Sequence, residues 1–226
     1  MNQQGVVAAS EAVYDAERAL RRAAETVDEL ADVAASSLRL LDEAASDAFY
    51  AHQEEHRRLY LRSAGEHLER VRNRSGVMNE LGEDLTRHLT TASNALEQAG
   101  YELGRSTDEN DRDAEIHALR TQIGVVGEVV SLARSLADQI TRHAQHAVES
   151  AAATDVLMLL DSRVHDTGKE MNRADEGVSV MRSVIEHAQS RAHTSAALAG
   201  SLTYAASHPT PPDAATPKPG QSGIAI

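Results

Sequence analysis

The first 208 residues contain no proline, and all five prolines of the chain lie between Pro209 and Pro219. Because proline interrupts helix interiors and collects in loops, so long a proline-free stretch favours a few long helices. Alanine, leucine, arginine, glutamate and glutamine, all strong helix formers, dominate this stretch. No segment alternates apolar and polar residues with the period of two that is typical of strands. The sequence therefore predicts an all-α protein.

Apolar residues recur in steps of three and four along four segments, 13–45, 64–103, 116–151 and 157–192. Such near-heptad seams are typical of helices that pack side by side as in a coiled coil. The pattern predicts long antiparallel helices joined by an Ala/Leu/Val seam.

Three irregularities divide these helices. The polar segment 104–111 begins with Gly104 and offers several N-cap residues, so we expect a hairpin turn near residue 107, with residue i facing residue 215 − i. The regular alternation of three- and four-residue steps in the apolar series is interrupted at 60–64 and again at 151–157. The pairing of residue i with residue 215 − i places these two phase changes opposite each other in the hairpin.

Two architectures fit these breaks. One is a rod of two helices of ~95 residues, about 140 Å long, distorted at that height. The other folds back there into a four-helix bundle, which we prefer because a lone two-helix rod leaves much alanine-rich surface half-buried. The expected helices span about 9–62, 64–104, 112–152 and 155–206.

Residues 207–226 form a separate segment rich in proline, threonine and glycine, which we expect to be a flexible, disordered tail. The segment ends in two alternating isoleucines, Ile224 and Ile226. A spacer with this ending suits docking as an added strand or capture of the terminal carboxylate. The tail is therefore a candidate docking element.

Composition narrows the function. The chain has 35 acidic and 22 basic residues, a net charge of −13, which argues against nucleic acid and against anionic lipid as the main partner. The absence of cysteine excludes a disulfide scaffold, a cysteine-ligated zinc module and a thiol enzyme. Neither a run of ~20 apolar residues nor a secretory signal is present, so we expect no membrane span and a cytoplasmic protein.

Charges of opposite sign are segregated along the chain. Segment 10–48 holds ten carboxylates and four arginines. A basic band follows, made of Arg57, Arg58, Arg62, Arg70, Arg72 and Arg74. We expect such blocks to pair between helices or between copies of the chain, with an acidic protein partner or a phosphate-bearing ligand as the alternatives.

One string suggests metal chemistry. Residues 52–56 read His-Gln-Glu-Glu-His, which matches the H-x-x-E-H string of inverzincin metallopeptidases. On a helix, His52 and His56 share a face, and the resemblance implies that they bind zinc with Glu55 as general base. Those peptidases are α/β proteins, however, and this chain shows no strands. His143 and His146, three residues apart, form at most a weak metal pair. No histidine follows a glutamate by three residues, which argues against a ferritin-like di-iron site, and we expect no cofactor.

A second string resembles an export signal. Tyr50 and Glu54 fit the Y-x-x-x-D/E pattern of type VII secretion substrates, which are also helical hairpins. Their W-x-G turn is missing, because the chain contains no tryptophan. The resemblance implies an alternative function as a helical effector or substrate of such a system.

No catalytic signature emerges, so we expect a non-enzymatic structural or interaction protein with a protein partner or a second copy of itself. The mechanism would be association of helix faces, with burial giving ~25 cal/mol per Å² of apolar area. The residues expected to carry it are Leu20, Leu30, Leu41, Leu85, Leu96, Ile123, Val130 and Ile140.

Overall fold

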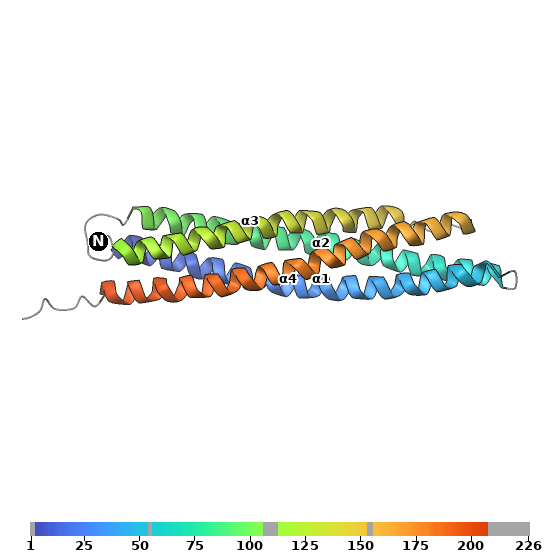
Figure 1. The fold of residues 1–226 in the computed structure, drawn as a ribbon, viewed down its shortest axis with the longest axis horizontal. Helices are drawn as coiled ribbons and strands as arrows, with labels where there is room; N and C mark the ends of the chain where they lie inside the picture. The colour runs from blue at the N-terminus through green and yellow to red at the C-terminus, as the bar shows by residue number, and fades with distance from the viewer. Residues whose placement is uncertain (1–2, 54–55, 106–112, 153–155, 208–226) are drawn as a thin grey trace, which may run out of the picture.

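The structure, a computed structural model, describes residues 3–53, 56–105, 113–152 and 156–207. These residues form four α-helices and no strand (Figure 1). The helices are α1 (Gln3–Ala51), α2 (Arg57–Gly104), α3 (Asp113–Ser150) and α4 (Leu157–Ser207). The all-α prediction is confirmed, and the expected tail lies outside the described residues.

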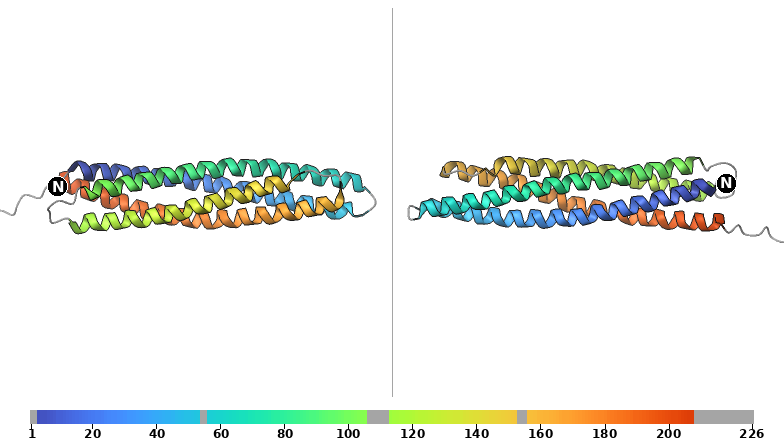
Figure 2. Two further views of the ribbon diagram at one scale, coloured as in Figure 1. Left: turned by 90° about the horizontal axis from the view of Figure 1, so that it is seen from above. Right: turned by 180° about the vertical axis from the view of Figure 1, so that it is seen from behind.

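The four helices run up, down, up and down along one long axis (Figures 1 and 2). Each helix packs against its neighbour in the chain, and α4 packs against α1, which closes the ring. The last residues of α1 and α3 and the first residues of α2 and α4 lie at the same end of the bundle (Figure 1). At 1.5 Å per residue, the 49 residues of α1 span about 74 Å. The fold-back into four helices is therefore confirmed over the extended rod.

The core runs the length of the bundle and is built from the predicted seams. All eight seam residues proposed as interaction residues are buried between the chain's own helices. Each exposes 5 % of its surface or less: Leu20, Leu30, Leu41, Leu85, Leu96, Ile123, Val130 and Ile140. In this bundle they pack against the chain's own helices and are not exposed to a second molecule.

The position predicted for the break between α1 and α2 is wrong. The phase change predicted a break at 62–64, whereas α1 ends at Ala51 and α2 begins at Arg57. His56 makes this turn with φ of 71°, the single positive φ of a non-glycine residue in the described chain. No glycine or proline marks the turn, and the first buried residue of α2 is Ala64. The apparent phase change falls in the first two turns of α2, where no residue is fully buried.

The register between α2 and α3 also differs from expectation. The rule 215 − i places residue 133 opposite Gly82, but Gly82 faces Thr141 instead. Asn79 and Gln145, whose side chains share a hydrogen bond of 3.1 Å, follow the same shifted register. The rule assumed that α2 ends and α3 begins at the same level along the bundle, whereas α3 begins beyond the end of α2 (Figure 1).

The remaining helix ends lie within a few residues of those expected, except that α1 begins earlier, at Gln3. None of the helices in the described chain combines the length and apolar character that crossing a bilayer requires.

Candidate functional site

The predicted zinc string does not lie on a helix. His52 follows the end of α1, and His56 precedes α2, so the shared face that the hypothesis needs does not exist. His52 Nε2 lies 3.0 Å from Asp161 Oδ2, so the residue that follows α1 contacts the beginning of α4. Glu55 lies outside the described residues. Within the ranges that the structure describes, no group of three histidine or carboxylate side chains is placed to hold a metal ion.

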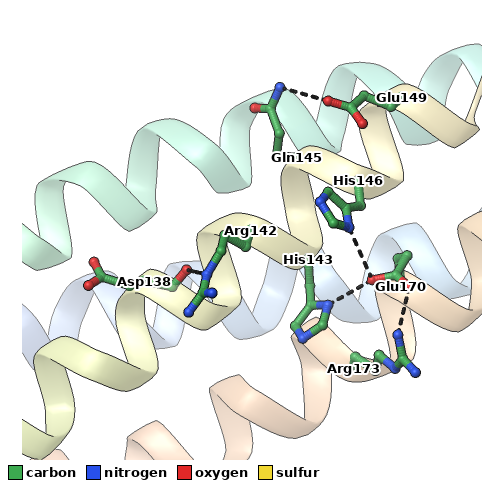
Figure 3. Close-up of polar contacts among 8 residues, drawn as sticks. All are labelled: Asp138, Arg142, His143, Gln145, His146, Glu149, Glu170 and Arg173. Atoms are coloured by element: carbon green, nitrogen blue, oxygen red, sulfur yellow. Dashed lines mark hydrogen bonds and ion pairs between the residues drawn. The ribbon is translucent and has the colours of Figure 1, made fainter.

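The best-defined polar cluster joins α3 to α4 around Glu170 (Figure 3). His143 Nδ1 donates to Glu170 Oε2 at 2.7 Å, and Arg173 Nη1 donates to Oε1 at 2.8 Å. His146 Nδ1 lies 4.0 Å from the same Oε2. Both members of the histidine pair therefore face one carboxylate, whose side chain is only 14 % exposed.

The pKa of the Glu170 carboxyl is lowered from its ordinary value. The hydrogen bond from His143 is the largest cause, and the charges of Arg173, His143 and His146 add to it. Burial acts in the opposite direction and is outweighed. The hydrogen bond from His143 links α3 to α4, and Arg173 donates to the other oxygen of Glu170 from within α4. The sequence showed the histidine pair, but Glu170 and Arg173 become its partners only through the register of α3 and α4.

Six of the exposed apolar residues belong to the end of α1, the start of α2 and the start of α4, and these three helix ends lie at the same end of the bundle (Figure 2). Phe49 is 65 % exposed, Leu59 64 % and Met158 83 %. The ring of Tyr50 packs between those of Phe49 and Tyr60, with centroids 5.6 and 5.5 Å away. We call this surface the tip and define it by its six exposed apolar residues. They are Phe49, Tyr50, Leu59, Val156, Met158 and Leu159.

The tip also carries positive charge. Arg57 and Arg58 open α2 beside Leu59, and both are exposed. No ion pair joins either arginine to a carboxylate of the described chain, whereas Arg62 pairs with Glu66 at 3.1 Å. The tip thus combines apolar side chains with two arginines that lack an ion-pair partner among the described residues.

Other exposed apolar residues differ in kind. Along the sides of the bundle they are isolated, as with Val77, Leu132 and Val180. The opposite end exposes mainly tyrosines, including Tyr101, whose ring lies 5.7 Å from the Arg105 guanidinium. A tyrosine keeps a hydroxyl for water, whereas Phe49, Leu59 and Met158 have no polar side-chain group to solvate. Sequence reasoning missed the tip, although the only phenylalanine of the chain was a signal for it.

The structure places the other candidates as follows. Tyr50 of the export-like string belongs to the tip, and its partner Glu54 lies outside the described residues. Ile224 and Ile226 also lie outside them, so the docking role of the tail stays a prediction.

A groove of about 660 Å³ runs between α1 and α4 on the side of the bundle. Leu41 borders it together with Leu38, Val164 and Gly168, and charged groups such as Lys169 stand at its rim. It is an open trough between two helices and not an enclosed pocket.

No known protein family matches the chain, and neither a curated protein nor a solved structure does so.

Proposed function

We propose that this protein is a non-enzymatic, helical interaction protein that docks a partner through its tip. The observation that carries this proposal is the contrast between seam and tip. The seam residues are buried inside the bundle, whereas six apolar side chains at one end stay exposed. A group of exposed apolar residues at one place on a globular protein is typical of an interaction site, while single exposed apolar residues need no explanation.

Energetics support the same conclusion. Burying a side chain such as Phe49, Leu59 or Met158 contributes roughly 1.5–3 kcal/mol relative to leaving it in water. A few such anchors carry most of the binding energy in protein interfaces, where phenylalanine, methionine and arginine are enriched. Phe49, Leu59 and Arg58 are therefore the residues expected to matter most.

The geometry of the tip also favours docking. Its residues lie at the ends of α1, α2 and α4, and His52 beside the end of α1 contacts Asp161 of α4. Residues that helices hold in place lose little conformational freedom on binding, so the entropic cost of binding is smaller and the affinity is higher. The polar clusters lend no support to an enzymatic alternative, because the best-defined of them is an ion-pair link between α3 and α4.

A site-specific crosslink tests this proposal. A photoreactive phenylalanine analogue is placed at Leu59 on the tip, or as a matched control at Leu132, which is 55 % exposed on the side of α3. After irradiation in native lysate, we expect discrete crosslinked species from position 59 that Phe49→Asp abolishes. Equal crosslinking at both positions, or none at position 59, would refute docking through the tip. Mass spectrometry of the crosslinked species identifies the partner.

A further inference from the structure

Histidine supplies most of the positive charge that pairs one helix with another. Among the ion pairs that the described residues make with one another, those of arginine stay within one helix, except that Arg182 of α4 reaches Asp28 of α1 at 2.8 Å. Arginine keeps its charge throughout, whereas histidine changes its charge between about pH 5 and 8. The remaining pairs, which join different helices or the residue after α1 to α4, are made by His52, His67, His143, His146 and His193.

Two of these links, one in each hairpin, lie in the half of the bundle that carries the tip. They are His67 to Glu43 and Asp47, between α2 and α1, and His143 and His146 to Glu170, between α3 and α4 (Figure 3 shows the second). All six residues lie within about 20 Å of the tip-side end of their own helix. In the other two pairs, the side chains of His52 and His193 are 53 % and 77 % exposed, and ion pairs so open to water contribute little to stability.

His67 is the most deeply buried of these histidines, with 17 % of its side chain exposed. Its Nδ1 lies 3.2 Å from Glu43 Oε2 and its Nε2 lies 3.5 Å from Asp47 Oδ2, so a carboxylate stands near each ring nitrogen. Nδ1 is buried and has no hydrogen-bond partner in the described chain. A neutral imidazole carries a proton on one nitrogen only, so a lone pair then lies near one of the two carboxylates. The protonated ring has an N–H at both nitrogens, and its charge attracts both carboxylates.

The other charged groups around His67 leave this attraction in place. The register of Asn79 with Gln145 puts His67 beyond the end of α3 at Ser150. Lys169 of α4 lines a groove on the face of α1 opposite to Glu43 and Asp47. On α2 the neighbouring charges are the pairs of Glu66 with Arg62 and of Glu69 with Arg72, and the exposed Arg70. Asp47 is itself only 20 % exposed, so water screens its attraction less than that of a surface pair.

The link between α3 and α4 has the same chemistry. Glu170 is 14 % exposed, and its Oε2 lies 2.7 Å from His143 Nδ1. His146 Nδ1 lies 4.0 Å from this oxygen, so His143 makes the closer contact. The charges that lower the pKa of Glu170 come from these two histidines on α3 and from Arg173 on α4. Because the attraction is mutual, a proton bound by His143 strengthens the contact between the two helices.

We infer that proton binding to His67 and His143 stabilises the tip half of the bundle, which is therefore more stable at about pH 6 than at about pH 8. Aspartate and glutamate titrate near about pH 4, so over this range the histidines are the groups that change charge. The added stability is present at the lower pH and is lost as the pH rises and the rings lose their protons. Arg182 and Asp28, in the middle of the bundle, stay paired at both pH values. The inference concerns the fold and holds whether or not the tip docks a partner.

Urea unfolding of the full chain at about pH 6 and pH 8, followed by circular dichroism, tests this inference. His67→Gln keeps a polar side chain that cannot bind a proton, and His143→Gln does the same in the other hairpin. His117→Gln is the matched control, because His117 is exposed on α3 and makes no ion pair with the described chain. Each variant is compared with itself at the two pH values, so a general loss of stability does not affect the result.

We expect the equilibrium constant for unfolding of the unchanged chain to be roughly tenfold smaller at the lower pH, because two links gain a charge. His67→Gln and His143→Gln should each reduce this ratio at least twofold, whereas His117→Gln should leave it unchanged. In the variant Glu43→Gln/Asp47→Asn, which removes both carboxylates, His67→Gln should no longer change the ratio.

Three results would overturn the inference. If the ratio of His67→Gln or of His143→Gln equals that of His117→Gln, the inference is wrong for that hairpin, and the effect belongs to the smaller net charge of a chain with eleven protonated histidines. A stability that stays constant or falls between the higher and the lower pH contradicts it for the whole bundle. An effect of His67→Gln that persists without Glu43 and Asp47 shows that the proton on His67 acts through other groups.

Discussion

The close approach of α2 and α3 at Gly82 gives a sharp test of the packing. A Cβ atom added at Gly82 would lie 2.2 Å from Thr141 Oγ1 and 3.4 Å from Thr141 Cβ. Thr141 Oγ1 is itself held by a hydrogen bond of 3.0 Å to the carbonyl of Ala137. In Gly82→Ala, therefore, Thr141 must rotate and lose that bond, or the two helices must move apart.

The expected magnitude is a difference of two effects. Overpacking of a tight core contact costs about 1–3 kcal/mol. Replacing a glycine inside a helix by alanine stabilises it by about 1 kcal/mol, because alanine loses less backbone freedom on folding. Gly82→Ala should therefore destabilise the bundle by about 1 kcal/mol. Gly76→Ala, in the same helix with no atom near its new Cβ, should stabilise it by a similar amount.

Urea unfolding followed by circular dichroism measures both changes. The double variant Gly82→Ala/Thr141→Ala removes the clashing oxygen, so it should recover most of the stability that Gly82→Ala loses. The two substitutions should then show a coupling energy of about 1 kcal/mol or more. If Gly82→Ala stabilises the protein as much as Gly76→Ala does, then α2 and α3 are not in the close contact described and the reasoning is refuted.

Three further predictions test other parts of the molecule. Leu96→Asp, at a position 2 % exposed, should cost several kcal/mol because a buried charge lacks a partner, and an unchanged thermal midpoint would contradict that face assignment. Because the pKa of Glu170 is lowered in the folded chain, this carboxylate stabilises the fold above its ordinary pKa of 4.5, and that stabilisation is lost as the pH falls towards the lowered pKa. In urea unfolding at several pH values, the free energy of unfolding of Glu170→Gln should therefore fall less steeply over this range than that of the unchanged chain. A chain ending at His208 should keep the helicity and melting temperature of the full chain, since the removed segment lies outside every apolar period, and a lower midpoint would show that the segment packs on the bundle.

The seams could be predicted from the sequence because the positions that a packed helix buries recur with the helical period and are occupied by apolar residues. Leu85 and Ile140, for example, are apolar because they point into the core. The turn at His56 escaped prediction because residues 52–56 contain no glycine or proline, and a histidine takes the left-handed conformation. Ser63 and Glu66 resemble a helix start, yet both lie inside α2.

The surfaces were harder to predict than the core. Leu59 and Met158 are as apolar as seam residues, and only the end of the bundle shows that nothing of the chain covers them. The partnership of His143 with Glu170 depends on how α3 lies against α4, which no local pattern encodes. Periodicity therefore determined which residues are inside, whereas exposure at the helix ends and contacts between helices required the three-dimensional arrangement.

The central claim is that a single chain folds back to bury its own seams, which leaves the tip as its working surface. Spin labels at Arg18→Cys and Thr91→Cys test this directly, because the chain has no other cysteine and both positions are exposed. In the bundle these residues lie on neighbouring helices at about the same level. Pulsed electron paramagnetic resonance should therefore give a distance between the two spin labels on the order of 20 Å. This distance should persist when labelled protein is diluted with unlabelled chain. A separation of about 110 Å, as one continuous helix would give, or a short distance that vanishes on dilution, would contradict the claim.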